Sequence, residues 1–198
     1  SDIGEPKQGL ITGDNERFLR RWWEVSQDMI YYLGTEFKSK KWFLYQKGGE
    51  FRKWYGNNEY VVNWSNGGEQ IINFYSKDGK LKSRPQNIKY YFKEGMSWTS
   101  LTNATFNGRY VSEGFIFDAK GPMLFSKRIK YLIGFLNSNV GNYLLNIISP
   151  TIDFSQGPVG NLPLMIEDEH LVNEITDTCI KLSKKDWDAN ETSWDFSK

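Results

Sequence analysis

Two stretches of the sequence combine basic side chains with aromatic rings. Residues 38–53 hold six Lys or Arg residues against Glu50 alone, residues 77–93 hold six against Asp78 alone, and aromatic residues interrupt both runs. Basic groups neutralise phosphates and aromatic rings stack on bases, so this composition is typical of a polynucleotide-binding surface. Each window is also typical of a solvated loop, or of a strand edge that lysine protects from aggregation. The chemistry indicated is nucleic-acid binding, with solvated loops as the alternative.

Side chains that could serve as nucleophile, general base or metal ligand are few. The chain holds one cysteine, Cys179, and one histidine, His170, which excludes an internal disulfide and a histidine-based zinc site. We expect Cys179 to pack in the core and His170 to lie at the surface or in a packing contact. Asp-x-Lys triplets at residues 78–80 and 118–120 could begin a metal-dependent nuclease site, but neither follows a well-placed acidic partner.

Motifs for methyl transfer and for phosphate binding are missing from the sequence. None of the six prolines is next to another, which excludes the Asn/Asp-Pro-Pro-aromatic loop that holds an extruded adenine. The sequence also lacks a Gly-rich strand-to-helix turn for a cofactor and a GxxxxGK[ST] phosphate loop. It therefore predicts a chain that binds and does not catalyse a reaction, with no cofactor or metal of its own.

The charges divide the chain into a basic and an acidic part. Lys and Arg total 25 against 24 Asp and Glu, but residues 1–130 carry 21 basic against 14 acidic side chains and residues 131–198 carry 4 against 10. Aromatic residues make up 16% of the 198 residues, which argues against intrinsic disorder. With no apolar run near the length of about 18 residues that spans a bilayer, we expect a soluble, cytoplasmic protein that makes no membrane contact.

The elements that must position these side chains change in character near residue 130. Before it, β-branched and aromatic runs between Asn and Gly turns predict strands, although residues 17–25 are only moderately favoured as a strand over a helix. The expected strands cover residues 17–25, 60–64, 70–75, 96–101, 105–110 and 114–118, with a hairpin turn at residues 65–68. Strand-borne tryptophans usually fill a packed face, and on this ground we expect burial of Trp22, Trp23, Trp64 and Trp98.

After residue 130 the pattern is helical. Apolar residues recur at three- and four-residue spacing over residues 131–148, and residues 166–182 begin with acidic and end with basic side chains. We expect one α+β domain: a β-rich basic part at 1–130 with a mixed or antiparallel sheet, followed by two C-terminal helices at 131–185 that pack on it. Residues 186–198 contain two tryptophans without an obvious partner element, as in a truncated tail of a larger enzyme.

Several segments resemble the target-recognition region of bacterial adenine-specific DNA methyltransferases. The likeness is to the PglX-type enzymes of bacteriophage-exclusion (BREX) systems, with type II restriction-modification methylases as neighbours. The residues that carry it are GLITGDNERF at 9–18, KWFLYQKGGEFRKWYGNNEYVVNW at 41–64, SRPQNIKYYFKEGMSWTSLT at 83–102 and RYVSEGFIFDAKG at 109–121. A fifth segment, at 131–164, also resembles the end of recognition domains in type I specificity subunits.

The resemblance implies a recognition domain without its catalytic half. In that family, a catalytic domain holding S-adenosylmethionine and an Asn-Pro-Pro-Tyr loop flips and methylates the adenine, while the recognition region binds duplex DNA from the opposite side. Partners implied are double-stranded DNA, the catalytic domain of the same parent chain and other proteins of the defence system. The alternatives are a protein-interaction module of a phage-defence complex, and a free-standing enzyme or carbohydrate-binding β-domain.

Binding duplex DNA requires phosphate contacts for register and base-edge contacts for sequence. We expect phosphate contacts from Lys47, Arg52, Lys53, Lys82 and Lys89. Arginine suits guanine and asparagine suits adenine in the major groove, which makes base readers of Arg84, Asn87 and Arg109. Either role suits three residues beside the TGDN loop: Thr12, Asn15 and Arg17. Each has a local alternative, such as a turn fixed by Arg84 before Pro85, or a pair of Arg109 with Glu113.

Overall fold

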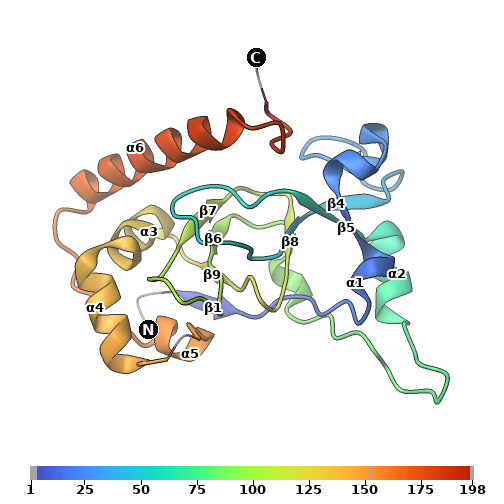
Figure 1. Cartoon of the computed structure of the whole chain (residues 1–198), viewed down its shortest axis with the longest axis horizontal. Helices are drawn as coiled ribbons and strands as arrows, with labels where there is room; N and C mark the ends of the chain where they lie inside the picture. The colour runs from blue at the N-terminus through green and yellow to red at the C-terminus, as the bar shows by residue number, and fades with distance from the viewer. Residues whose placement is uncertain (1–3, 152, 197–198) are drawn as a thin grey trace.

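Two β-sheets form the centre of the molecule (Figure 1). The structure, a computed structural model, describes residues 4–151 and 153–196. The first sheet is antiparallel, in the order β1 (Glu5–Lys7), β9 (Met123–Phe125), β6 (Gly95–Ser97) and β7 (Arg109–Val111). The second is mixed: its order is β2 (Leu19–Arg21), β5 (Tyr60–Asn63), β4 (Trp42–Gln46) and β3 (Ile30–Tyr31), and β8 (Phe115–Phe117) pairs with β4 in parallel. The predicted α+β class with mixed and antiparallel pairing is confirmed.

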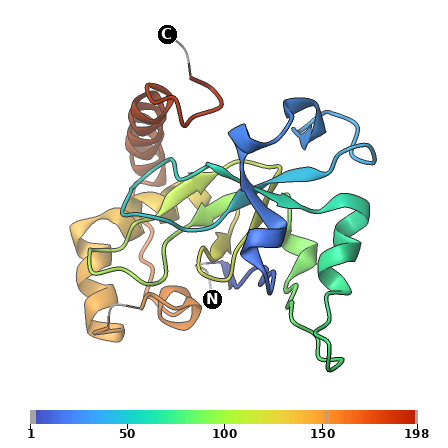
Figure 2. The same cartoon turned by 45° about the vertical axis from the view of Figure 1, so that its right-hand side comes forward.

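Helices gather at two sides of these sheets (Figures 1 and 2). On one side lie α3 (Ile129–Asn137), α4 (Asn139–Ile148) and α5 (Gln156–Gly160), with the long α6 (Glu169–Asp188) packed along α3. On the other side lie α1 (Asn15–Phe18), α2 (Ser65–Ile72) and the projecting loop that follows α2. Short 3₁₀ turns cover Trp22–Glu24, Gln27–Met29 and Ile88–Tyr90.

The core divides between the two sheets. One cluster surrounds β4, β5 and β8 and contains Trp64 and Phe117, and the other joins β6 to α3 and contains Trp98. Burial of Trp64 and Trp98 is therefore confirmed. Trp23 is 47% exposed, so its predicted burial is wrong. Trp22 is only half-buried, and its indole N–H donates a hydrogen bond to the Thr192 carbonyl at 2.8 Å.

The predicted hairpin at residues 65–75 is wrong. Asn66, Gly67 and Gly68 do turn with positive φ, but the chain then forms the helical end of α2 instead of a strand. The two residues here that pack on the core, Ile71 and Phe74, are three positions apart. That spacing places both on one face of a helical turn and on opposite faces of a strand.

The predicted helix at 131–148 is two helices. Ser138 interrupts it and caps α4, its hydroxyl oxygen accepting a hydrogen bond from the Gly141 N–H at 3.0 Å. A Cβ at Gly141 would lie 2.2 Å from the Phe135 carbonyl oxygen, so this close turn requires glycine. Other expected elements are shorter than predicted: residues 17–25 form α1, β2 and a 3₁₀ turn, and residues 96–101 and 105–110 keep only β6 and the start of β7.

The C-terminal tryptophans are packed, against expectation. α6 begins at Glu169, where the Asp168 carboxylate accepts a hydrogen bond from the Leu171 N–H at 3.2 Å, and it continues to Asp188. Trp187 is buried, and the ring of Trp194 lies 5.9 Å from that of Phe115. The long helix persists because its last turn buries Trp187 against the loop that contains Arg52.

Candidate nucleic-acid interface

The loop at residues 9–15, which contains the TGDN sequence, meets two segments that are distant from it in the sequence. Leu10 lies against Asp118, with hydrogen bonds from the Leu10 N–H to the Phe117 carbonyl at 2.8 Å and from the Ala119 N–H to the Leu10 carbonyl at 3.2 Å. Its neighbour Ile11 exchanges two backbone hydrogen bonds with Arg84, at 3.1 and 2.7 Å. The loop is therefore held between residues 82–84 on one side and residues 117–119 on the other.

Gly13 allows the close approach of the loop to Lys82. Its φ is +77°, and a Cβ there would lie 2.6 Å from the Lys82 carbonyl oxygen. Only glycine combines this conformation with this contact. Asn87 adds a further tie, because its side-chain amide donates to the Gln8 carbonyl at 2.8 Å.

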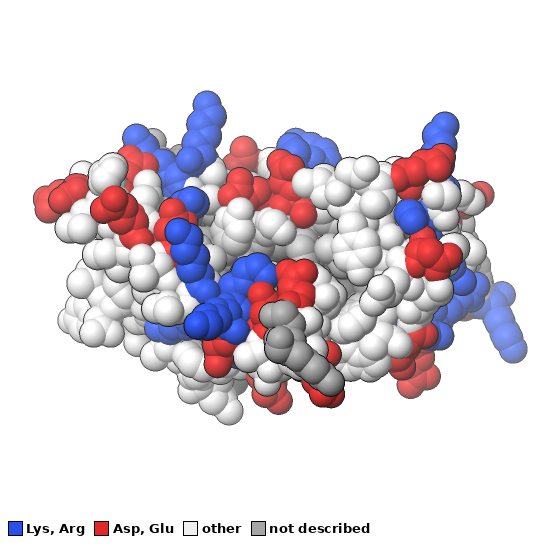
Figure 3. All heavy atoms as spheres, turned by 90° about the horizontal axis from the view of Figure 1, so that it is seen from above, with Lys and Arg blue, Asp and Glu red and all other residues white. Residues whose placement is uncertain are grey.

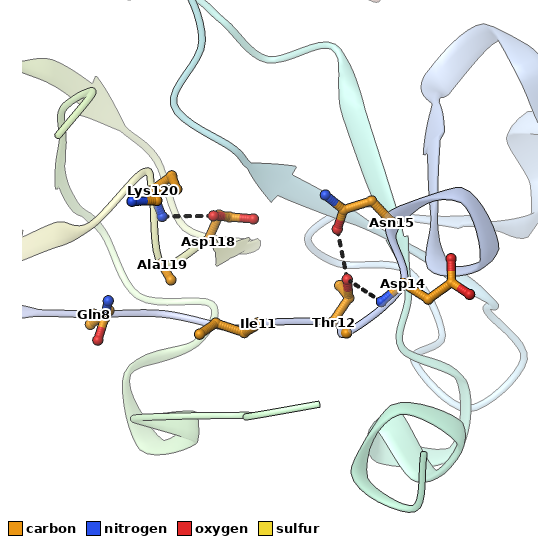
Figure 4. A pocket seen from close by; sticks show the side chains of 9 residues that line it. Gln8, Ile11, Thr12, Asp14, Asn15, Asp118, Ala119 and Lys120 are labelled. Carbon is orange, nitrogen blue, oxygen red and sulfur yellow. Dashed lines mark hydrogen bonds between the residues drawn. The ribbon is translucent and has the colours of Figure 1, made fainter. Parts of the chain in front are cut away.

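A cleft of about 480 Å³ opens between these segments, and we call it the N-terminal cleft. Figure 4 shows its lining, formed by Gln8, Ile11, Thr12, Gly13, Asp14, Asn15, Asp118, Ala119 and Lys120. Thr12 is buried at the centre, donating to Asn15 Oδ1 at 2.6 Å and accepting from the Asp14 N–H at 3.3 Å. These bonds fix the loop and orient the exposed Asn15 side chain.

The Asp118 carboxylate is fixed in this cleft by hydrogen bonds to both of its oxygens. It is 8% exposed, and its two oxygens accept from the Tyr45 hydroxyl at 2.8 Å and from the Lys120 N–H at 2.7 Å. Burial raises the pKa of Asp118, while both hydrogen bonds and the charges of Lys47 and Lys120 oppose that rise. Burial likewise raises the pKa of the Tyr45 hydroxyl, with the Asp118 charge adding to it.

Five basic residues line the cleft or belong to the segments beside it, and we call them the basic rim. Its members are Arg17, Lys47, Lys82, Arg84 and Lys120. Lys120 lines the cleft itself, whereas the side chains of Lys82 and Arg17 lie 4.6 and 5.0 Å from the Phe74 ring. Lys47 is half-buried over the ring of Tyr60 at 4.6 Å, and the other four are exposed. Within residues 4–151 and 153–196, no rim residue takes part in an ion pair. These cations are therefore available to an external anion.

Arg52 and Lys53 lie away from the cleft, against the C-terminal helices. The Arg52 guanidinium pairs with Asp186 of α6 at 2.5 Å and donates to the Tyr55 carbonyl at 2.8 Å. The Lys53 ammonium donates to the Asn137 carbonyl at 3.0 Å, and burial lowers the pKa of Lys53. Both side chains are used within the fold.

Arg109 has no exposed surface. Its guanidinium donates to the Arg52 carbonyl at 3.2 Å and to both oxygens of Asn107, at 3.1 Å for the carbonyl and 2.9 Å for Oδ1. Burial lowers the pKa of Arg109 to about 10. A side chain enclosed in this way cannot reach a base edge in this conformation, so we assign Arg109 to the fold.

The two basic windows do not converge on one groove. Lys82 and Arg84 of the second window, with Lys47 of the first, belong to segments beside the N-terminal cleft. Lys89 lies elsewhere, 5.3 Å from the ring of Tyr90, which Lys7 and Lys93 also approach. Figure 3 views the molecule from the side of α6 and shows basic and acidic atoms interspersed, without a continuous positive surface.

Of the nine residues that line the cleft, the sequence predicted only Thr12 and Asn15 as site residues. Asp118 and Lys120 form one of the Asp-x-Lys triplets, and the only signal that could mark them as part of a site was this pairing of opposite charges. Gln8 carried no signal, since its place depends on contacts with residues 86 and 87. His170 lies on the surface, as expected, whereas Cys179 is only partly buried.

Between residues 4 and 196, leaving out 152, no group of three or more His, Cys, Asp or Glu side chains is arranged to hold a metal ion. The helices in that same part of the chain are too short or too polar to cross a membrane.

Comparison with known proteins relates the chain to part of much longer enzymes. It is 41% identical over 203 aligned positions to the adenine-specific methyltransferase PglX of Lacticaseibacillus casei (strain Zhang), covering 99% of this chain and 17% of that protein. It is 39% identical over 197 positions to the adenine-specific methyltransferase BrxX of Escherichia coli O9:H4 (strain HS), covering 96% of this chain and 15% of that protein. No protein-family model matches the chain. Nearly all of this sequence thus corresponds to about one sixth of a PglX- or BrxX-type methyltransferase.

Proposed function

We propose that this chain is the DNA target-recognition domain of an adenine-specific DNA methyltransferase, and that the N-terminal cleft with its basic rim binds duplex DNA. The observation that carries the proposal is a cleft that presents an amide and a carboxylate, with rim cations in its lining and in the segments beside it that take part in no ion pair among the described residues. Phosphate neutralisation needs such cations, and base readout needs donors and acceptors at fixed positions. The similarity to PglX and BrxX supports DNA as the ligand, since both are adenine-specific methyltransferases by name.

In this proposal the rim residues have distinct tasks. Lys82, Lys120 and Arg17 neutralise phosphates, and Lys47 adds positive charge near Asp118. Arg84, fixed by its backbone bonds to Ile11, and Asn15 are the base readers. Lys89, with Lys7 and Lys93 around Tyr90, forms a separate patch that contacts phosphates further along the duplex.

The reaction itself belongs to the rest of the parent protein in this proposal. A catalytic domain outside this sequence binds S-adenosylmethionine and transfers its methyl group to a flipped adenine, in the cytoplasm of a bacterium that uses the mark for phage exclusion or restriction-modification. The present chain contributes binding energy and site selection, and no cofactor contact.

Salt dependence of duplex binding tests the proposal. If Arg17, Lys82 and Lys120 each neutralise one phosphate, the rim adds about −2.7 to the log–log slope of affinity against salt, at about −0.9 for each phosphate. Fluorescence anisotropy with a labelled duplex measures that slope. Lys82→Ala with Lys120→Ala should reduce its size by about 1.8. Lys181→Ala with Lys185→Ala removes the same charge from exposed positions of α6 and should leave it unchanged. Binding that is absent, insensitive to salt or equally affected by both pairs contradicts the proposal.

Exposed apolar residues favour a second candidate function, a protein-interaction module. Val140, Tyr143 and Ile147 of α4 are exposed at helical spacing, as are Leu171 and Ile175 of α6. Apolar residues grouped on one helical face often mark a protein contact. If the chain binds no duplex but associates with the remaining segments of a PglX-type methyltransferase, and Tyr143→Glu abolishes that association, this second function replaces the first.

A further inference from the structure

Two polar groups of different kinds face the same space in the N-terminal cleft. Figure 4 shows the Asn15 amide on one wall and the Asp118 carboxylate on the other. The Thr12 hydroxyl donates to Asn15 Oδ1 at 2.6 Å, which leaves the Asn15 NH₂ group directed into the cleft. Asn15 therefore presents hydrogen-bond donors and Asp118 presents acceptors.

The Asp118 carboxylate is fixed before any ligand arrives. One oxygen accepts from the Tyr45 hydroxyl and the other from the Lys120 N–H, at 2.8 and 2.7 Å. A carboxylate offers about four acceptor positions, so each oxygen keeps capacity for another donor. Because Asp118 is so little exposed, a group can reach that capacity only by entering the cleft.

The edges of the four bases differ in what they present to such an acceptor. In the major groove, adenine and cytosine present amino groups, which donate, while guanine and thymine present keto oxygens, which only accept. Adenine also places the N7 acceptor beside its amino group, so it can satisfy both the Asn15 donor and the Asp118 acceptor. A keto oxygen brought against the carboxylate would leave two acceptors facing each other without a proton.

We infer that Asp118 is a specificity-determining residue that selects an amino-bearing base at one position of the recognised duplex, with Asn15 favouring adenine over cytosine there. This inference rests on the proposed function, because it assumes that the cleft binds duplex DNA. Asp118 rejects guanine and thymine as much as it attracts adenine and cytosine.

Asp118→Asn tests the inference, with Asp14→Asn as its matched control. Both variants remove one negative charge from the cleft lining. The Asp14 carboxylate, however, accepts from the Arg17 N–H at 3.0 Å as the cap of α1 and points away from Asp118. Asparagine can cap a helix as well as aspartate does. Any general gain in affinity from lost repulsion should therefore appear in both variants, and a change in base preference only in Asp118→Asn.

The assay is selection from a library of randomised duplexes by the purified chain, followed by sequencing of the bound fraction. The wild type and Asp14→Asn should enrich sites with adenine or cytosine at one position by about 5-fold to 100-fold over guanine or thymine. Asp118→Asn should lose most of that preference while still binding duplex DNA. Retained binding with the wild-type preference at every position overturns the inference and leaves the proposed function intact. A wild-type chain that binds no duplex overturns both.

Asp118→Asn has only one side-chain oxygen and cannot keep the hydrogen bonds from both the Tyr45 hydroxyl and the Lys120 N–H in their present form. A second variant is therefore needed in case Asp118→Asn folds poorly. Asn15→Asp changes an exposed residue and keeps an oxygen for the Thr12 hydroxyl. It places an acceptor where the donor stood, so the selected base should shift from adenine toward cytosine. An unchanged adenine preference in Asn15→Asp, in a variant that melts at the wild-type temperature, also overturns the assignment.

Discussion

Arg52→Ala should destabilise the fold far more than a change at an exposed lysine. The guanidinium donates from Nε to the Tyr55 carbonyl at 2.8 Å and from a terminal nitrogen to the Ser183 carbonyl at 3.3 Å, and it lies 5.1 Å from the centre of the Trp187 ring. The same nitrogen pairs with Asp186. One side chain thus joins the loop at residues 52–56 to the last turns of α6.

The expected loss follows from these contacts. Each hydrogen bond from a charged donor to a half-buried carbonyl contributes about 1 kcal/mol or slightly more, and the contact with Trp187 adds about 0.5–1 kcal/mol. The Asp186 partner is 72% exposed, so the ion pair itself contributes less than about 1 kcal/mol. The free energy of unfolding should fall by about 3 kcal/mol, which for a chain of this size lowers the melting temperature by roughly 6–12 °C.

Urea unfolding followed by tryptophan fluorescence measures the loss directly, and two further variants apportion it. Asp186→Asn removes only the ion pair and should cost less than about 1 kcal/mol. Lys82→Ala, at the basic rim, should stay within about 0.5 kcal/mol of the wild type. If Arg52→Ala unfolds at the wild-type urea concentration but loses duplex binding, Arg52 is a phosphate contact and the role assigned to it in the fold is refuted.

Three other predictions follow from described contacts. Arg109→Ala should lower the free energy of unfolding by about 3 kcal/mol or more, because it leaves a cavity and deprives the Arg52 and Asn107 oxygens of their donor; a guanidinium chloride midpoint equal to that of the wild type contradicts this. Gly141→Ala should lower the melting temperature in calorimetry by several degrees, since its Cβ meets the Phe135 carbonyl, whereas a neutral result would mean that the turn at Ser138 shifts freely. Burial raises the pKa of Asp118 in the folded state, so the folded protein binds more protons than the unfolded chain and the wild type gains stability relative to Asp118→Asn as the pH falls from 7 through the raised pKa. Urea titrations at successive pH values test the sign, and a wild type that loses stability relative to the variant on acidification would reverse it.

The local sequence pattern predicted those strands and helices whose residue composition alone marks a buried face. β5 and β8 combine β-branched and aromatic residues with buried faces, and both were expected. β4 was missed because all five of its residues are buried, and a strand covered on both faces shows no alternation. The second helix was placed correctly in its middle, but its true end depends on Trp187, whose contacts lie more than a hundred positions away in the sequence.

For the candidate site too, the sequence indicated some of the residues but not how they come together. The TGDN loop could be singled out by its glycines and polar side chains, and its neighbours Lys82 and Arg84 by their charge. Their meeting depends on the backbone pairing of Ile11 with Arg84, which no composition reveals. Arg52 shows the other side of this dependence: its charge indicated a phosphate contact, and in the structure its guanidinium pairs with Asp186, 134 positions later in the sequence. Charge density predicts which residues can bind anions, and long-range pairing decides which remain free to do so.

The backbone bonds at Asp118 have an implication for how recognition could diversify. Its N–H donates to the Gln46 carbonyl at 2.8 Å, so the bottom of the N-terminal cleft continues the ladder between β8 and β4. By contrast, the side chains of Lys82 and Arg84 are exposed and do not pack in the core. Substitutions at Lys82 and Arg84 should change the free energy of unfolding little, whereas substitutions at Asp118 disturb the pairing of β8 with β4. Related proteins can therefore acquire new sequence preferences through substitutions at positions 82 and 84 while they keep Asp118 as a base reader.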